Sequence, residues 1–332
     1  MSTDSINPVL PPPPPPPPFD PGAPAGQQKR SRVWLWLLIG GGAFFLFVAA
    51  LFTLIFLSVK HGQRTEVAGG SPFGEKIGVI ELEGVILDAD TFLKQLKKFD
   101  EDDSIKAIIL KINSPGGGAA ASQEMYQAVR RVRERHKKPI VAAISTVGAS
   151  GAYYVAAGSD KIFANSASIV GSVGVIAEWV NYGDLLHWAK LKDVTMKAGE
   201  LKDAGSPTRD MTPKEREYLQ SLIDDMHAQF IHDVAEGRKI KDEQLKPLAT
   251  GQVWTGQQAM ALPVKLVDTI GSFQDAVDDT AKKVGIKGEP TLVRPEKERR
   301  SLYDILFNDA SDLIPDRAKM LENHPGFYYM WR

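Results

Sequence analysis

The longest apolar run of the chain, Val33–Val59, contains no charged residue. At a rise of about 1.5 Å per residue, a helix of this length spans about 40 Å, which is enough to cross a hydrocarbon core of about 30 Å with some tilt. A cleaved signal peptide has a shorter apolar region, so the run predicts a permanent transmembrane helix over residues 33–59. The chain is thereby divided into a short part before the membrane and a long part after it.

Basic residues flank the predicted helix on both sides and set its expected orientation. Lys29, Arg30 and Arg32 precede it, and Lys60 and Arg64 follow it. Because cytoplasmic flanks carry the excess of lysine and arginine, this small difference favours a cytosolic N-terminus. We expect a single-pass protein of the cytoplasmic (inner) membrane, with the long C-terminal part on the outer side.

The residues before the predicted helix, 1–32, are of low complexity and include the unbroken proline run Pro11–Pro18. Proline fixes φ and removes a backbone donor, so we expect a disordered polyproline II tail that is either a spacer or a ligand for an SH3-like domain. Residues 60–75 are expected to form a linker. The chain has no cysteine, which excludes disulfides, thiolate catalysis and cysteine-ligated metals, and its net charge of −1 gives no reason to expect a nucleic-acid partner. We expect neither a cofactor nor a metal.

Strand-like and helix-like segments alternate after the linker, which is typical of a mostly parallel sheet with crossover helices. A long amphipathic helix is expected after Thr212, with Thr212 as N-cap, Pro213 at the first position and Glu215 completing a capping box. These patterns predict an α/β domain over residues 76–290 and a C-terminal tail over residues 291–332. The expected strands are residues 76–86, 105–114, 139–145 and a pair within 161–176, and the expected helices are residues 118–138, 150–159 and 212–238.

Two turns rich in small residues could carry chemistry. The segment INSPGGG (Ile112–Gly118) ends an expected strand, and its successive glycines leave backbone N–H groups able to point at an anion. No Lys–Ser/Thr pair follows, so it is not a Walker loop. Ser150, within GASGA, lies between a strand and a helix. It is either an incidental residue of a close-packed turn or a nucleophile that a substrate approaches closely. Ala152 stands where the α/β-hydrolase elbow has a glycine, so that fold fits poorly.

The base that would activate Ser150 is not an obvious histidine. Each histidine is expected on the surface or in packing, so the sequence does not support a Ser–His–Asp triad. A serine can instead be activated by a lysine, although a free lysine with a pKa near ~10.4 is the wrong base at neutral pH until burial lowers that value. The candidate is Lys202, in a loop-like segment between a strand and the long helix, with Lys197 as competitor and a solvated surface charge as the alternative for either. The six histidines are His61, His136, His187, His227, His232 and His324.

Four segments in this order resemble the signal peptide peptidase SppA family of membrane-anchored serine peptidases, whose fold is the Clp-protease/crotonase-like α/β fold. The resemblance covers about residues 77–286. The segments are INSPGGG, STVGASGAYYVAAGSDKIFANSASIVGSVGVI, LKDAGSPTRDMTPKER and AEGRKIKDEQLKPLATGQVWTGQQAMALPVKLVDTIG.

The resemblance implies a role for five residues of this chain. Ser150 would be the nucleophile and Lys202 the general base, together forming a Ser–Lys dyad. Gly117 and Gly151 would donate the hydrogen bonds of the oxyanion hole, and Ser172 would orient the lysine. The implied activity is that of a serine endopeptidase that degrades signal peptides or other apolar peptides released in the membrane.

The sequence departs from the family pattern at two places. Ala152 replaces a glycine that often follows the nucleophile turn, and LPVKLVD (Leu262–Asp268) lacks a glycine that usually precedes LVD. Neither change removes a catalytic group.

The resemblance also implies a homo-oligomeric ring. The aromatic segment HPGFYYMWR near the end of the chain is expected either to find a partner surface or to pack on its own domain or the membrane interface. The glycine- and alanine-rich surroundings of Ser150 predict small apolar residues at the cleavage site. Two alternatives stay open: a crotonase-like acyl-CoA enzyme and a catalytically inactive scaffold, the latter favoured by the proline-rich tail.

Overall fold

The computed structural model describes residues 66–68, 75–136, 138–295 and 327–330. The chain divides into two compact units, Met1–Gly62 and Gln63–Arg332, and all described residues belong to the second. Among them no helix is both long and apolar enough to cross a membrane. The predicted tail over residues 1–32 and the predicted transmembrane helix over residues 33–59 lie outside the described residues.

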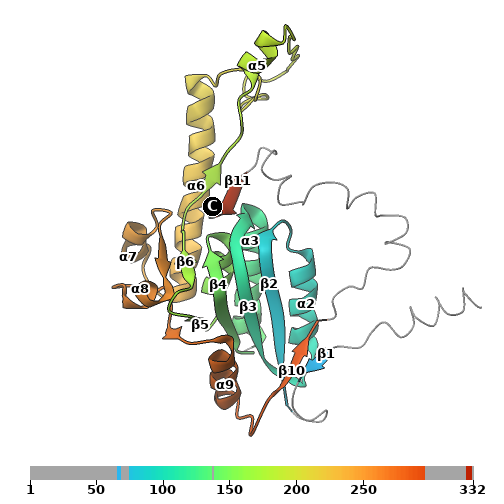
Figure 1. The fold of residues 1–332 in the computed structure, drawn as a ribbon, viewed down its shortest axis with the longest axis vertical. Coiled ribbons are helices and arrows are strands. Elements are labelled where there is room, and N and C mark those ends of the chain that lie inside the picture. The colour runs from blue at the N-terminus through green and yellow to red at the C-terminus, as the bar shows by residue number, and fades with distance from the viewer. Residues whose placement is uncertain (1–65, 69–74, 137, 296–326, 331–332) are drawn as a thin grey trace, which may run out of the picture. The chain divides into compact units, whose positions relative to one another are not determined.

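Four parallel strands form the middle of a mixed sheet (Figure 1), and the buried residues of each strand are mostly apolar, as expected where both faces are covered. Along the sheet the strand order is β1-β10-β2-β3-β4-β5-β9. The strands in this order are β1 (Glu66–Ala68), β10 (Thr291–Arg294), β2 (Lys76–Ile86), β3 (Ile105–Gly118), β4 (Ile140–Ala149), β5 (Lys161–Ala164) and β9 (Thr269–Ile270).

Shorter strands extend the sheet at the end where β3 and β4 finish. β6 (Ile169–Gly171) pairs with β4 and with β8 (Val253–Thr255). β11 (Phe327–Met330) runs antiparallel to both β3 and β7 (Ile176–Ala177). The aromatic segment near the chain's end therefore pairs with its own domain.

Three strands lie outside the boundaries that the sequence predicted for the domain. β1 comes from the segment predicted as a linker, and β10 and β11 come from the segment predicted as a C-terminal tail. The sheet thus extends beyond residues 76–290. Strands of three or four residues are too short to give a clear alternating pattern, which is why the sequence did not reveal them.

Helices cover both faces of the sheet, and the alternation of side chains along β3 separates two apolar clusters. Ile108 and Leu110 pack in a large cluster with α2, α3, α4 and α6, whereas Ile109 packs in a smaller one with α9. These helices are α2 (Asp90–Glu101), α3 (Ala119–Arg131), α4 (Gly151–Ala157), α6 (Pro213–Arg238) and α9 (Phe273–Lys283); the smaller ones are the π-helical turn Val132–His136, α5 (Gly183–Trp188), α7 (Asp242–Leu245), the 3-10 turn Lys246–Leu248 and α8 (Gly256–Ala261).

The long helix α6 begins as the sequence predicted. Thr212 caps it, Pro213 occupies its first turn, and the side chains of Thr212 and Glu215 form the reciprocal bonds of a capping box. Its C-terminal half packs on α4, where Gly237 allows close approach: a Cβ there would lie 2.4 Å from the carbonyl oxygen of Ala157. This contact fixes α6 against the helix that follows Ser150.

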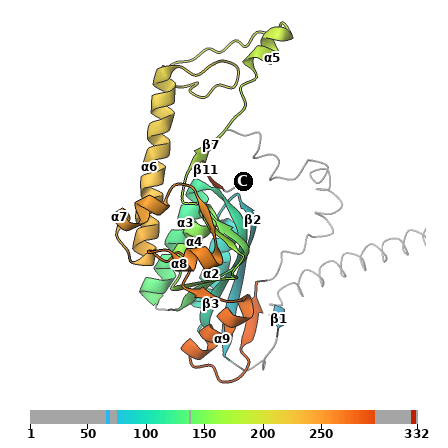
Figure 2. The same cartoon turned by 60° about the vertical axis from the view of Figure 1, so that its left-hand side comes forward.

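No residue from 174 to 214 is buried. This range follows β6 and ends in the first turn of α6. It contains α5, and its exposed apolar side chains include Trp188 (81% exposed) and Met196 (95% exposed). Figures 1 and 2 both show α5 and the amino-terminal end of α6 lying away from the sheet. We call residues 174–214 the extension.

Candidate active site

Ser150 occupies the turn from β4 into α4 in a strained backbone conformation. Its φ is 53° and its ψ is −120°, a region that residues other than glycine rarely adopt. Its N–H donates to the carbonyl of Gly171 on β6 over 2.7 Å, and its carbonyl accepts a bond from the N–H of Tyr154 over 2.8 Å. These two bonds hold a sharp strand-to-helix turn of the kind that presents nucleophilic serines.

The hydroxyl of Ser150 is unpaired. The residue is 1% exposed, and its Oγ has no hydrogen-bond partner among the described residues. Buried hydroxyls in proteins are nearly always paired, and unpaired ones often mark a functional group. Of the two interpretations of GASGA, strain together with an unpaired hydroxyl favours the nucleophile over an incidental packing residue.

The two tyrosines after Ser150 have a structural role. Tyr153 and Tyr154 are both fully buried. The hydroxyl of Tyr153 donates to the carbonyl of Leu266 over 2.9 Å, and that of Tyr154 donates to the carboxylate of Asp233 on α6. Burial raises the pKa of Tyr153, so its hydroxyl stays protonated and keeps donating. The tyrosines therefore anchor α4, which in turn fixes the turn at Ser150.

Gly117 lies on β3 between two partner strands, opposite Ile86 of β2 and Tyr329 of β11. A Cβ at Gly117 would lie 2.1 Å from the carbonyl oxygen of Ile86, which is closer than real contacts allow. At Gly118 the nearest atom would be 3.6 Å away, an ordinary contact. Close approach of β2 therefore requires glycine at position 117 but not at 118.

The carboxyl ends of β3 and β4 bring the glycine run and Ser150 to the same edge of the sheet. The strands are adjacent and parallel, with Ser114 opposite Gly148, so Gly117 and Ser150 follow at neighbouring strand ends. Gly151 is the first residue of α4, and the first N–H groups of a helix have no acceptor within it. The N–H of Gly151 is thus free to donate beside the hydroxyl of Ser150.

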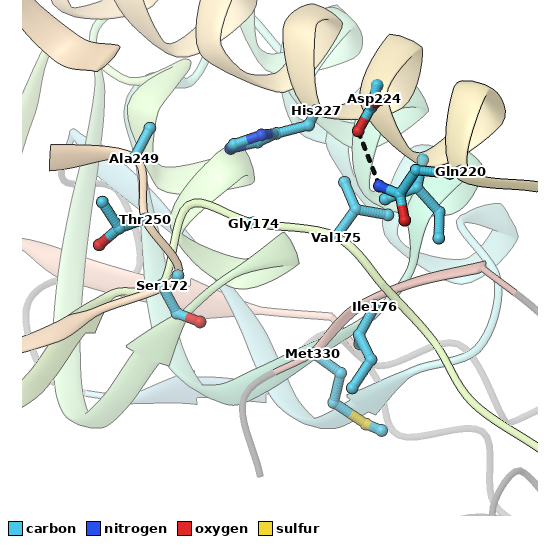
Figure 3. A pocket seen from close by; sticks show the side chains of 12 residues that line it. Ser172, Gly174, Val175, Ile176, Gln220, Asp224, His227, Ala249, Thr250 and Met330 are labelled. Carbon is cyan, nitrogen blue, oxygen red and sulfur yellow. Dashed lines mark hydrogen bonds between the residues drawn. The ribbon is translucent and has the colours of Figure 1, made fainter. Parts of the chain in front are cut away.

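Ser172 follows β6 and lines a cavity of about 450 Å³ (Figure 3). It has a φ of 54°, and its N–H donates to the carbonyl of Gln252 over 2.8 Å. The residue before Ser172, Gly171, accepts the bond from the N–H of Ser150. One wall of the cavity therefore begins directly after the residue that holds the turn at Ser150. It is lined by Ser172, Gly174, Val175, Ile176, Gln220, Ile223, Asp224, His227, Ala249, Thr250, Gly251 and Met330.

His227, for which the sequence predicted a surface or packing role, lines this cavity from α6. Its Nε2 is buried without a hydrogen-bond partner among the described residues. Figure 3 shows the ring beside Ala249 and Gly174, while Gln220 donates to Asp224 further along the same helix over 2.8 Å. No local pattern could have revealed this placement, because it depends on how α6 packs against the loop at residues 249–251.

Lys202 is not brought to Ser150 within one chain. It lies in the extension between α5 and α6, and its side chain is exposed. The burial that a lysine base requires is therefore absent in the single chain, and α5 and irregular backbone lie between β7 and Lys202. The amine makes no hydrogen bond or ion pair with the residues that the structure describes.

The amine of the competing Lys197 already has two partners within the same loop. Its amine pairs with the carboxylate of Asp203 and donates to the carbonyl of Glu200 over 3.1 Å. Of the two lysines, only Lys202 presents an amine without such partners. In the described part of the chain, no group of three or more His, Asp or Glu side chains could hold a metal ion.

Comparison with known proteins finds two families that match overlapping parts of the chain. Residues 132–287 match peptidase family S49, and residues 79–170 match the Clp protease family. The second match runs from β2 into β6 and includes Gly117 and Ser150, so the mixed α/β domain is Clp-protease-like. The first includes Ser150, Ser172 and Lys202.

Three proteins show how far the similarity extends along the chain. A putative signal peptide peptidase SppA of Enterococcus faecium is 36% identical over an alignment of 222 residues, and the alignment covers 63% of this chain and 64% of that protein. A putative protease of Methanocaldococcus jannaschii is 34% identical over 66% of this chain and 70% of its own length. A putative protease of Synechocystis is 38% identical over 64% of this chain and 76% of its own length. The chain thus spans a little under two thirds of the first relative and more of the other two.

Proposed function

This chain belongs to peptidase family S49, and on that premise we propose that it is a membrane-anchored serine endopeptidase that uses a Ser–Lys dyad. The observation that carries the proposal is Ser150, a strained, buried and unpaired hydroxyl at a strand-to-helix turn. Acyl transfer from a peptide needs a nucleophile, a proton acceptor and donors for the developing oxyanion.

The oxyanion would be stabilised by backbone N–H groups of Gly117 and Gly151. Gly151 directly follows the nucleophile, and its N–H is at the start of a helix, where negative charge is favoured. Gly117 lies at the neighbouring strand end, where close contact with Ile86 fixes its backbone. Fixed donors do not have to reorganise when the charge develops, which is the source of their effect on the rate.

Lys202 would accept the proton of Ser150, with Ser172 orienting its amine. Lys202 is exposed and lies in the segment between α5 and α6, and both figures show α5 and the amino-terminal end of α6 away from the sheet that carries the turn at Ser150. We therefore propose that Lys202 serves the Ser150 of a second copy. Exposed apolar side chains on the same segment, among them Leu185, Trp188 and Val194, would supply the surface that joins the copies. Docking would remove the amine from water, which favours the neutral form that a base requires. A head-to-tail contact forms a ring when the rotation between successive copies closes, and we propose that it does so here.

A peptide substrate would bind as an added strand beside β3. β11 of this chain pairs antiparallel with residues 116–118 of β3, next to Gly117, which supports an extended binding mode at this edge. Main-chain pairing is independent of side-chain identity, and the small residues around Ser150 leave shallow walls. We therefore propose apolar peptides with small residues at the cleavage site, such as cleaved signal peptides, as substrates.

The predicted transmembrane helix over residues 33–59 would anchor this peptidase in the cytoplasmic membrane with its N-terminus in the cytosol. The catalytic domain would then lie outside the membrane, near peptides released from it. This part of the proposal depends on the sequence pattern, since those residues lie outside the described part of the chain.

To test the proposal, the purified chain is incubated with an unfolded apolar peptide and cleavage of the peptide is measured. We expect cleavage that disappears in Ser150→Ala, while circular dichroism stays unchanged because a methyl group fits where the hydroxyl is. Turnover of coenzyme A esters instead of peptides would favour the crotonase-like alternative. A folded chain without either activity would favour the scaffold, and a strong preference for Arg or Lys before the cleaved bond would contradict the proposed substrate class.

A further inference from the structure

Four charged side chains join the loop around Lys202 to the start of α6, and we call Lys197, Asp203, Arg209 and Glu215 the ionic clamp. Arg209 is at its centre, because its guanidinium contacts two carboxylates at once. Its Nη2 lies 2.9 Å from Oδ2 of Asp203, and its Nη1 donates to Oε2 of Glu215 over 2.9 Å, with a second, parallel bond from Nη2 to Oε1 of Glu215. A planar fork that holds one carboxylate with two parallel bonds is the most directional ion pair available to a side chain.

Glu215 is the rigid end of the ionic clamp. The residue is 3% exposed, and its carboxylate also accepts a bond from the N–H of Thr212 over 2.8 Å as part of the α6 capping box. The Arg209 guanidinium, followed by the Thr212 N–H, lowers the pKa of Glu215 to about 2. Glu215 therefore stays ionised throughout the neutral range and fixes Arg209 to the helix.

Asp203 is the end of the ionic clamp next to the proposed base. Its carboxylate pairs with Lys197 and Arg209. Hydrogen bonds from Lys197 and then from Arg209 are the main causes that lower the pKa of Asp203. Its carbonyl accepts a bond from the N–H of Ser206 over 3.0 Å, and the N–H of Lys202 donates to the carbonyl of Gly199 over 3.2 Å. The backbone on both sides of Lys202 is thus tied down.

Apolar burial contributes little to the order of this loop. No residue from 174 to 214 is buried, so the segment has no core of its own, and ion pairs and turn hydrogen bonds remain to define its shape. The two ion pairs of Asp203 involve side chains of Lys197 and Arg209 that are about a third exposed, and exposed ion pairs add only about 0–1 kcal/mol each to stability. A network built around one bidentate arginine is therefore better suited to fixing a geometry than to stabilising the fold.

We propose that Arg209 is a positioning residue for the peptidase reaction: it joins Asp203, the neighbour of Lys202, to Glu215 on α6, and so fixes where the amine of Lys202 is presented. The inference rests on the proposed function, in which Lys202 is the base. Misplacing a reacting group by about 1 Å costs on the order of 100-fold in rate. Loss of the ionic clamp should therefore act on the chemical step and leave peptide binding unchanged.

The test compares Arg209→Met with Arg216→Met in the full-length chain. Arg216 is an exposed arginine one position after Glu215, so it is a matched control on the same helix turn. For Arg209→Met we expect kcat to fall about 10- to 100-fold with KM changed less than about twofold. Hydrogen–deuterium exchange at Ala204 and Ser206, whose N–H groups donate within the loop, should accelerate. Arg216→Met should change none of these quantities.

A second variant and a second control keep the outcomes distinct. Arg209→Lys keeps the charge but loses the bidentate bonds, so it should recover part of the lost kcat; this would exclude an effect of misfolding, which thermal unfolding also monitors. The positioning role is refuted if Arg209→Met keeps kcat within about twofold while Lys202→Ala is inactive. It is also refuted if Arg209→Met loses kcat without faster hydrogen–deuterium exchange in the loop. Neither result refutes the assignment of Lys202 as the base. Substantial activity of Lys202→Ala would instead refute the base assignment, and this inference with it.

Discussion

Replacing Gly117 with alanine tests the proposed oxyanion hole through a clash that the structure defines. The added Cβ would lie 2.1 Å from the carbonyl oxygen of Ile86 and 2.6 Å from its nitrogen, about 1.3 Å short of ordinary contact at 3.4 Å. Both atoms belong to backbone that is paired in the sheet, so relief requires β2 and β3 to separate locally. Overpacking of this kind costs about 1–3 kcal/mol.

The same displacement would move the proposed donor away from the oxyanion. Losing one such donor costs about 10²- to 10³-fold in kcat, so Gly117→Ala should lower kcat by that order and the melting temperature by several degrees. Gly118→Ala is the matched control, because its Cβ meets nothing closer than 3.6 Å; it should keep kcat within about threefold. The assay is cleavage of a quenched fluorescent apolar peptide alongside thermal unfolding by circular dichroism. Gly117→Ala with the kcat of the unmodified chain and a lowered melting temperature would show that the position matters only for packing.

Further predictions address the base, the ionic clamp, the substrate edge and the topology. Lys202→Arg should be as inactive as Lys202→Ala, because arginine stays protonated at working pH, whereas Lys197→Ala should keep most of its activity. The Arg209 guanidinium, followed by the Thr212 N–H, lowers the pKa of Glu215 to about 2, below its unfolded value near ~4.5. The stability from this ion pair should therefore be present above about pH 4.5 and be lost as the pH falls toward 2, which thermal unfolding at a series of pH values measures. Removing residues 326–332 should lower KM for added peptides by about tenfold, since a tethered strand competes at an effective concentration near the millimolar range; an unchanged KM would mean that β11 does not occupy the substrate edge. A reporter enzyme that works only outside the cytoplasm, fused after Arg332, should be active, and activity of only a cytosolic reporter would reverse the proposed topology.

The parts of the fold that could be predicted from sequence are those with a local cause. The capping box of α6 follows from Thr212, Pro213 and Glu215 alone, and β2 begins and ends where its apolar pattern does. β3 continues through Gly118, beyond the expected end, because pairing with β2 and β11 keeps the glycine run extended. Glycine has no preference that a local reading could use, so only the partners decide its conformation.

The sequence pattern placed the two small-residue turns but not their roles. Gly117 and Ser150 lie at the ends of adjacent strands, and strand ends can be inferred from the pattern, whereas the roles proposed for Ser150, Gly151 and Gly117 come from the resemblance to a family. The position of Lys202 could not be inferred, since a loop with no buried residue carries no hydrophobic signal of where it lies. His227 lies in the cavity beside Ser172 because of how α6 packs, and β11 pairs with β3 although the two strands are far apart in the sequence. Both placements depend on contacts between distant segments.

The central claim is that Ser150 of one copy and Lys202 of another form one catalytic site, and mixing two inactive variants tests it most directly. Ser150→Ala and Lys202→Ala chains are each expected to be inactive, so they are combined at equal concentration under conditions that allow subunits to exchange, and peptide cleavage is measured against the unmodified chain. In a randomly mixed ring about a quarter of the sites carry both an intact serine and an intact lysine, so we expect activity near that fraction. Complete inactivity at every mixing ratio, with exchange verified by a labelled subunit, would contradict it.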